Sequence, residues 1–231
     1  MQSSKITIAV DGFAACGKST LAKALAKELG YSYVDSGAMY RAVTLYAMRK
    51  GYITTDDFFV NDLVADLDAI ELTFIYNEEV GFAEMYLNGE NVEKEIRTLR
   101  VSDFVSKVAA VPEVRYQLVK QQQKMGEDKG IVMDGRDIGT VVFPNAELKL
   151  FMTASPEKRA MRRYKELLEK GDEVNYEDVL RNVQNRDYID SHREDSPLRQ
   201  AEGAVTIDNS DMGLKEQFER ILNLVNRTIN Q

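Results

Sequence analysis

The sequence predicts an α/β fold in which helices flank a five-stranded parallel sheet. Five short runs of apolar and β-branched residues alternate with longer stretches that carry apolar residues at helical spacing. A region of roughly alternating polarity interrupts this order, and Asn88-Gly89 within it is a strong hairpin signal. Repeated strand–helix units at this spacing are typical of a parallel sheet with helical crossovers. We therefore expect a parallel-sheet core, an antiparallel β insertion and, from the later charge pattern, a helical lid.

The parallel strands are expected where short apolar runs end at polar or glycine-containing turns. The first run ends at Asp11-Gly12, and the third ends at Asp134. A run this short and this apolar is typical of a strand that is buried on both faces. The predicted strands are residues 6–10, 31–34, 130–133, 148–152 and 204–207.

The helices are predicted from apolar residues at spacings of three and four and from their end signals. Gly30 and Gly51 are stop signals for the first two helices, and Pro112 suits the first turn of a later one. An apolar stripe near the end of the chain predicts the last helix. The predicted helices are residues 19–29, 40–48, 99–110, 112–125, 156–169, 176–193 and 214–229.

The antiparallel insertion is expected near residues 71–92. Residues 71–76 alternate roughly between polar and apolar side chains, and residues 85–87 lead into the Asn-Gly turn signal. No internal repeat and no flexible linker divides the chain, and the polar stretch 191–202 is the nearest approach to a loose segment. We therefore expect one domain over residues 1–231.

Composition and charge exclude several classes of protein. Apolar residues make up 44% of the chain, and no apolar run approaches the ~20 residues of a membrane span. The net charge of -8 argues against bulk binding to nucleic acid or anionic membranes. Cys16 and His192 are the only residues of their types, which excludes an intramolecular disulfide and a cysteine-cluster zinc site. Residues 1–5 hold no signal-peptide core, so we expect a cytoplasmic protein, and one compact domain predicts a monomer.

A phosphate-binding loop is predicted between the first strand and the first helix. The segment matches the pattern G-x-x-x-x-G-K-[ST], in which backbone N–H groups and the helix N-terminus surround phosphates. In that pattern the lysine reaches the outer phosphates and the serine hydroxyl ligates Mg²⁺. The alternative is a glycine-rich turn with a helix-capping serine. The predicted nucleotide-binding residues are Gly12, Phe13, Ala14, Ala15, Cys16, Gly17, Lys18, Ser19 and Thr20.

Two features of this loop narrow its interpretation. Cys16 is either a reactive thiol, activated by the helix N-terminus and Lys18, or a small residue that fits a tight turn, and we favour the second. The chain has no Asn-Lys-x-Asp segment of the kind that reads guanine, and no apolar run ends in Asp-Glu as in many ATPases. These absences, with the short chain and its scattered arginines, favour a kinase for a small phosphorylated acceptor.

Polar residues follow the second and third predicted strands. Ser36 can cap a helix or bind an anion at its N-terminus, and Arg41 on the same helix can hold a phosphate bidentately. Asp134 lies at the carboxyl end of a strand, where ligands gather, and can hold Mg²⁺ directly or through water. The alternatives are a capped helix with a surface arginine, and an ion-pair turn made by Asp134, Arg136 and Asp137.

Charged residues recur at helical spacing in two later segments. A solvated basic face is one interpretation of each set. Because the two sets flank a polar loop, we favour a lid that closes over transferring phosphates and excludes water. The first set is Arg159, Arg162 and Arg163, and the second is Arg186, Asp190 and Arg193.

Over nearly its whole length, the sequence resembles the bacterial cytidylate kinases of the nucleoside monophosphate kinase family. The segment Asp134-Gly135-Arg136-Asp137-Ile138-Gly139-Thr140-Val141-Val142-Phe143-Pro144 is the most distinctive. The other segments that carry the resemblance are residues 12–20, 35–41, 108–115 and 186–198. The resemblance implies an ATP- and Mg²⁺-dependent kinase for CMP and dCMP, with a monophosphate-binding insertion at about residues 36–110 and a lid at about residues 158–198.

The resemblance also implies roles for individual residues. Ser36, Arg41, Arg136 and Arg193 match positions that hold the acceptor phosphate, while Ser106, Arg115 and Asp137 match positions that read cytosine. Arg186 and Asp190 match positions near the ribose, and Arg159 and Arg163 lie in the lid, where they meet the donor phosphates. The expected catalytic residues are Lys18, Arg136, Arg193, Arg159 and Arg163, and the expected metal ligands are Ser19 and Asp134.

The base-reading set agrees with the hydrogen-bonding groups of cytosine. An ionised Asp137 only accepts, which suits the N4 amino group, and Ser106 can share that task. Arg115 only donates, which suits N3 and O2. Uracil reverses these groups, so we expect CMP and dCMP to be acceptors and UMP to be much poorer. The rival hypotheses are a kinase for UMP or AMP, and a non-catalytic nucleotide sensor, which the intact Gly17-Lys18-Ser19 triplet disfavours.

Overall fold

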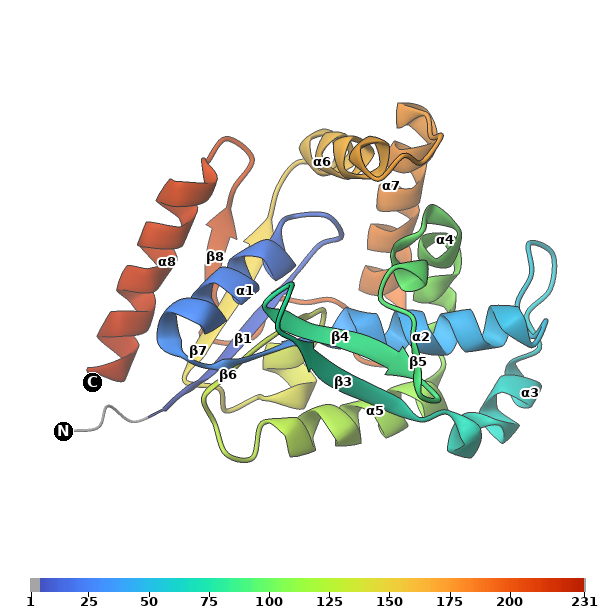
Figure 1. Cartoon of the computed structure of the whole chain (residues 1–231). Coiled ribbons are helices and arrows are strands. Elements are labelled where there is room, and N and C mark those ends of the chain that lie inside the picture. The colour runs from blue at the N-terminus through green and yellow to red at the C-terminus, as the bar shows by residue number, and fades with distance from the viewer. Residues whose placement is uncertain (1–4, 231) are drawn as a thin grey trace.

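A parallel sheet of five strands lies at the centre of the computed structural model, which describes residues 5–230 (Figure 1). The N-terminal stretch without a signal-peptide core lies, except for Lys5, outside the described residues. The strand order is β2-β6-β1-β7-β8, and every neighbouring pair is parallel. The five predicted strands are thus confirmed, each to within two residues at either end. They are β1 (Thr7–Gly12), β2 (Ser32–Asp35), β6 (Ile131–Gly135), β7 (Leu148–Thr153) and β8 (Val205–Asp208).

Strand β1 is the central strand, and its side chains alternate between two helical layers. Ile8 and Val10 pack in one core with helices α1 (Lys18–Leu29) and α8 (Leu214–Ile229). Ala9 points to the opposite face and joins the core near α5 (Pro112–Met125). Because both faces are covered, all six residues of β1 are buried, as its apolar sequence predicts.

The predicted antiparallel insertion forms a separate sheet with the order β3-β4-β5. Its strands are β3 (Leu72–Asn77), β4 (Phe82–Leu87) and β5 (Glu90–Asn91). Asn88 and Gly89 both have positive φ, of 49° and 81°, and join β4 to β5 through the two-residue turn that the Asn-Gly pair predicts. The insertion packs on helices α2 (Ser36–Arg49) and α4 (Leu99–Val108) in a core of its own.

Several short elements were absent from the sequence prediction. They are α3 (Val60–Ala65), the 3-10 turns η1 (Leu67–Ala69) and η2 (Glu95–Arg97), and the π-helical turn η3 (Ile138–Val142). Each has six residues or fewer, too short for apolar periodicity to be visible. Turn η3 matters most for the site, because it directly follows Arg136 and Asp137.

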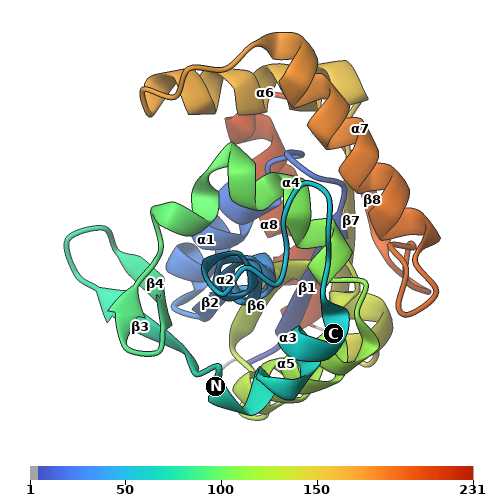
Figure 2. The ribbon, with the colours of Figure 1, turned by 90° about the vertical axis from the view of Figure 1, so that its right-hand side faces the viewer.

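Helices α6 (Pro156–Glu169) and α7 (Tyr176–His192) form a helical pair at one end of the molecule (Figures 1 and 2). They pack on each other through a small apolar cluster that includes Ala160, Leu167 and Val183. Among the residues that the structure describes, none of the helices is long and apolar enough to span a membrane. Since β1, β2 and β6 are parallel, the residues that follow these three strands meet at one edge of the sheet.

Candidate active site

The loop between β1 and α1 has the backbone shape that its glycines allow. A Cβ atom on Gly12 would lie 2.0 Å from the main-chain oxygen of Met152 on β7, so a larger residue would force the strands apart. Gly17 has a φ of 88° and directly precedes α1. Both glycines therefore have a steric reason for their positions in the motif. The backbone of the loop leads directly into the N-terminus of α1, where free N–H groups can bind an anion.

Lys18 lies inside this loop rather than on its surface. Its Nζ donates hydrogen bonds to the main-chain oxygens of Gly12 at 2.9 Å and Phe13 at 2.7 Å. Burial, together with the positive charge of Arg136, lowers the pKa of Lys18. The ammonium group is thus held inside the loop by neutral carbonyl groups, which leaves its charge available to an anion.

Ser19 and Asp134 bring α1 and β6 together. The Ser19 hydroxyl donates to Oδ2 of Asp134 at 2.9 Å, and the Tyr33 hydroxyl donates to Oδ1 at 2.8 Å. Burial and the nearby negative charge of Asp35 raise the pKa of Asp134. A cation beside this carboxylate would offset both effects, because it would supply the positive charge that the buried acid lacks.

The same pair fits a magnesium ion in its chemistry. Mg²⁺ prefers oxygen ligands and is held in nucleotide sites by one or two protein oxygens together with phosphate oxygens. Within residues 5–230, no group of three or more His, Cys, Asp and Glu side chains is placed to hold a metal by itself. Ser19 and Asp134 therefore suit a metal that arrives with a phosphate ligand.

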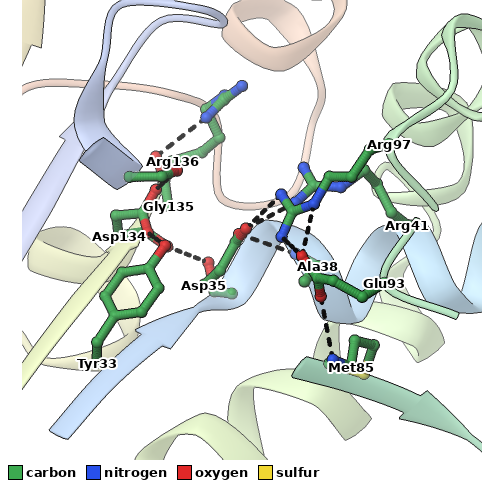
Figure 3. A network of polar contacts seen from close by, with 12 residues as sticks. Tyr33, Asp35, Ala38, Arg41, Met85, Glu93, Arg97, Asp134, Gly135 and Arg136 are labelled. Atoms are coloured by element: carbon green, nitrogen blue, oxygen red, sulfur yellow. Dashed lines mark hydrogen bonds and ion pairs between the residues drawn. The ribbon is translucent and has the colours of Figure 1, made fainter. Parts of the chain in front are cut away.

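Asp35 organises the start of helix α2 (Figure 3). Its Oδ1 accepts from the N–H of Ala38 at 2.9 Å, which caps the helix. Its Oδ2 accepts from Arg41 at 2.8 Å and from Arg97 at 2.7 Å. Although burial favours the neutral acid, the two guanidinium groups hold the pKa of Asp35 well below its usual range. Two arginines are thus gathered at one helix N-terminus.

Arg97 is held from both sides, and sequence reasoning did not single it out. Besides Asp35, it contacts Glu93, which accepts from its Nε at 3.0 Å and from a terminal nitrogen at 2.6 Å. Glu93 also accepts from the N–H of Met85 on β4 at 3.1 Å (Figure 3). Strand β4 of the antiparallel sheet therefore helps to orient Arg97, because it holds Glu93 in place. Ser36 lies beside the group and donates to the main-chain oxygen of Asp134 at 2.7 Å.

A buried ion pair occupies the far end of the site. Arg115 and Asp137 are both almost fully buried and form a salt bridge. Arg115 also donates to the main-chain oxygen of Ala109 at 3.0 Å, and its guanidinium lies 5.4 Å from the ring centre of Tyr40. Arg193 approaches the same carboxylate at 3.9 Å. The pair thus presents a fixed acceptor and a fixed donor side by side.

Asp190 links two other predicted site residues. Its Oδ1 accepts from the Ser106 hydroxyl at 2.8 Å, and its Oδ2 accepts from Nε of Arg136 at 2.9 Å. Ser106 is therefore joined to the predicted ribose group rather than directly to Asp137. Arg186 donates to the Ser102 hydroxyl at 2.9 Å. Burial, with the charge of Arg136, lowers the pKa of Arg186 to about 9.

The three arginines of α6 have different surroundings although they share one helix. Arg159 is buried behind the phosphate loop, where it donates to the main-chain oxygen of Ala14 at 3.1 Å and pairs with Asp187 at 2.6 Å. Arg162 donates to the side chain of Asn209 at 2.9 Å. Arg163 donates to the main-chain oxygen of Arg97 at 2.6 Å, so α6 contacts the turn η2 across the site.

One cavity of about 1400 Å³ joins these groups. Its wall includes the phosphate loop from Ala14 to Thr20, the Ser19–Asp134 pair and the buried Arg115–Asp137 pair. Arg159 is not part of this wall, and neither are Gly12 and Phe13 at the start of the loop. The arginines that line the cavity are Arg41, Arg97, Arg115, Arg136, Arg162, Arg163, Arg186 and Arg193. A cavity with so many arginines is suited to several phosphate groups.

The comparison with known proteins agrees with this arrangement, since a family model described as Cytidylate kinase matches residues 8–227. The chain belongs to the cytidylate kinase family. A cytidylate kinase from Flavobacterium johnsoniae is 65% identical over 225 residues, covering 97% of this chain and 98% of that protein. Cytidylate kinases from Flavobacterium psychrophilum and Parabacteroides distasonis are 61% and 57% identical, covering 96% and 97% of this chain and 98% of each relative.

For this member of the cytidylate kinase family, sequence reasoning also missed residues outside the recognised motifs. Asn209 directly follows β8, donates to the main-chain oxygen of Cys16 at 2.8 Å and thereby supports the phosphate loop. Cys16 itself is fully buried in the apolar core, which favours the interpretation as a small packing residue. Asp11 and Arg97 were also missed. Asp11 directly precedes the first motif glycine, a position that offered a signal, whereas Arg97 lies in a short turn with no pattern.

Proposed function

We propose that this chain transfers the γ-phosphoryl group of ATP to CMP and dCMP, giving ADP and CDP or dCDP. The observation that carries the proposal is the single cavity with the phosphate loop at one end and the buried Arg115–Asp137 pair at the other. Arginines from α2, η2, α5, α6, the segment after β6, and α7 with its C-cap line this cavity. Residues 12–20 bind the donor phosphates, the insertion at about residues 36–110 binds the monophosphate, and residues of about 158–198 act as the lid.

Catalysis in this proposal depends on positioning and on charge stabilisation. The acceptor oxygen belongs to a phosphate that is already anionic, so the reaction needs little help from a general base. Lys18 neutralises charge on the transferring group, together with Arg136 and Arg193 and with Arg163 from the lid. Arg159 acts on the loop, through its bond to the main-chain oxygen of Ala14, rather than directly on the phosphates.

Magnesium belongs to the proposed donor site. When bound there with the nucleotide, the ion supplies positive charge to the phosphate oxygens. Ser19 and Asp134 hold it, and Tyr33 orients the Asp134 carboxylate through its 2.8 Å hydrogen bond. Ser36 and Arg41 hold the acceptor phosphate, and Arg41 is held in place by Asp35 (Figure 3).

The Arg115–Asp137 pair determines base selectivity. Asp137 accepts from the N4 amino group of cytosine, and Arg115 donates to N3 and O2. Uracil would present a carbonyl oxygen to the carboxylate and an N–H to the guanidinium. A buried polar mismatch costs roughly 1–3 kcal/mol for each unpaired group, so UMP should be a poor substrate. Ser106 contributes through Asp190, which it contacts at 2.8 Å.

The sugar lies beside Arg186 and Asp190, which line the same cavity. Asp190 is fully engaged by Ser106 and Arg136, so it keeps its bonding partners when the 2′-hydroxyl is absent. This satisfied carboxylate supports the use of dCMP as well as CMP. One chain supplies both ends of the cavity, which supports action as a monomer. The proposed substrates are nucleotides of the cytoplasm.

An ADP-release assay with ATP and Mg²⁺ tests the proposal. CMP, dCMP, UMP, AMP and GMP are compared as acceptors at concentrations below saturation. We expect CMP and dCMP to be strongly preferred. Preference for another monophosphate would leave the phosphate loop in its role but overturn the assignment of Arg115 and Asp137. Lack of ADP release with every acceptor would overturn the kinase proposal and support a nucleotide sensor.

A further inference from the structure

Asp11 is a buried carboxylate that none of the proposed binding roles uses. It lies near the end of β1, one residue before Gly12, and only 3% of its surface is exposed. Its Oδ1 accepts from the N–H of Ile138 at 2.8 Å, and its Oδ2 accepts from the N–H of Gly139 at 2.7 Å. The side chain therefore connects the strand that begins the phosphate loop with a segment more than a hundred residues later.

The two N–H groups belong to the first residues of turn η3. In a helical turn these first N–H groups have no acceptor within the turn itself. Asp11 supplies both acceptors, one from each carboxylate oxygen. A Cβ atom on Gly139 would lie 3.3 Å from Oδ2, so the glycine permits the close approach. Turn η3 directly follows Arg136 and Asp137.

The main chain at Asp11 is fixed independently of its side chain. In the sheet, Asp11 lies opposite Gly135 of β6 on one side and Phe151 of β7 on the other. The pairing of β1 with β6 and β7 holds the start of the phosphate loop in place independently of the Asp11 side chain. The carboxylate, in contrast, is the contact that orients η3 and hence the two residues before it.

We propose that Asp11 is a positioning residue that holds Arg136 and Asp137 in register with the phosphate loop. This inference rests on the proposed function, because its consequence is the placement of the acceptor nucleotide relative to the donor phosphates. Asp11 acts through its hydrogen bonds to the main-chain N–H groups of Ile138 and Gly139, and it contacts neither substrate. Without the cap, the main chain that carries Arg136 and Asp137 would shift relative to the phosphate loop, although Asp190 and Arg115 still pair with the two side chains.

The cap needs both carboxylate oxygens. In Asp11→Asn, one oxygen remains as an acceptor, while the amide NH₂ group faces the second N–H. Burial, with the negative charge of Asp137, raises the pKa of Asp11 to about 7, against the two N–H groups and Lys18, which lower it. Above that pH the wild-type carboxylate is ionised and accepts both bonds, so assays at about pH 8 compare the full cap with the half cap.

Steady-state kinetics of Asp11→Asn at about pH 8 test the inference. We expect the KM for CMP to rise about tenfold, the order for one buried N–H without an acceptor, and the KM for ATP to change by less than about twofold. The preference for CMP over UMP should narrow as well. Equal changes in both KM values, or no change in either, would overturn the inference.

Glu147→Gln is the matched control. Glu147 accepts from the N–H of Thr7 at 2.8 Å, so it bonds the other end of the same strand, away from the cavity. The control makes the same carboxylate-to-amide change, leaves an oxygen to accept from Thr7, and breaks only the partly exposed pair that the other oxygen makes with Lys129. We expect both KM values of Glu147→Gln to match those of the wild type. A rise in its KM for CMP like that of Asp11→Asn would count against a specific role of the cap.

Amide hydrogen exchange separates this inference from the proposed function. In the unaltered protein, the amides of Ile138 and Gly139 should exchange as slowly as those of β6, although they lie in a turn. In Asp11→Asn, exchange in residues 136–143 should become about tenfold faster while β6 is unchanged. Fast exchange in the unaltered protein would overturn the inference even if the variant fails to fold. Slow exchange without CMP phosphorylation would instead overturn the function and leave the cap intact.

Discussion

The hydroxyl of Ser19 lies 2.9 Å from Oδ2 of Asp134, so the first turn of α1 and the carboxyl end of β6 meet at a hydroxyl–carboxylate pair. The two residues are far apart in sequence and adjacent only because β6 pairs with β1 in the sheet. Their oxygens are of the kind that Mg²⁺ binds, and the raised pKa of the buried Asp134 indicates that a nearby cation would stabilise the ionised carboxylate.

Asp134→Asn should raise the Mg²⁺ concentration that gives half-maximal activity at least about tenfold, because the neutral amide is a weaker ligand for a hard cation. The measurement is a magnesium titration at saturating nucleotide. Asp128→Asn changes an exposed residue shortly before β6 and serves as the control. An unchanged midpoint in Asp134→Asn would remove this residue from the metal site.

Lys18→Ala should lower kcat at least about a hundredfold, because it removes a preorganised charge from the transferring phosphoryl group. Circular dichroism should report an unchanged fold, since the glycines determine the loop backbone. Lys27→Ala, on the exposed face of the same helix, should leave kcat unchanged. Wild-type turnover by Lys18→Ala would show that the lysine has no part in catalysis.

Asp137→Asn should reduce the ratio of kcat/KM for CMP to that for UMP about tenfold or more, because the new amide can donate to the O4 of uracil. The ratio is measured within one preparation, so a loss of stability from the unpaired Arg115 cancels. Such a loss should also occur, since breaking a buried ion pair is strongly destabilising. A ratio equal to that of the wild type would refute the assignment of Asp137 as the base reader.

The stability of the protein should carry a pH-dependent contribution from Asp11. Its pKa is raised from 3.8 to about 7 in the folded state, so between these values the folded chain binds more protons than the unfolded chain. The free energy of unfolding therefore falls as the pH rises through this window. The free energy of unfolding of Asp11→Asn minus that of the wild type should therefore rise from about pH 4 to about pH 7 and then stay constant. Urea unfolding of both proteins at each pH measures this quantity. A constant difference throughout would contradict the raised pKa.

The sequence was sufficient for those parts of the fold and site that depend on local pattern. The β-branched runs predicted the parallel strands to within two residues, and Asn88-Gly89 predicted its turn. The phosphate loop was recognisable because its steric needs require glycine at two fixed positions.

The parts of the site that the sequence did not predict depend on contacts between distant segments of the chain. Helical spacing placed Arg159, Arg162 and Arg163 on one face, but it could not tell that Arg159 would bond the phosphate loop and Arg163 the insertion. Arg97 is in the site because Glu93 and Asp35 hold it there, and neither contact leaves a periodic signal. The spacing of residues along a helix determines the face on which each side chain lies, whereas the residue that it contacts depends on the tertiary fold.

The central position of β1 has a consequence for synthesis on the ribosome. This apolar strand is synthesised well before its partners β6 and β7, which begin only at Ile131 and Leu148. At about 5–20 residues per second, translation leaves the strand without either neighbour for about ten seconds. The nascent chain must therefore carry an exposed aggregation-prone segment through about half of the synthesis of these 231 residues, and truncated products that end before β6 cannot assemble the sheet.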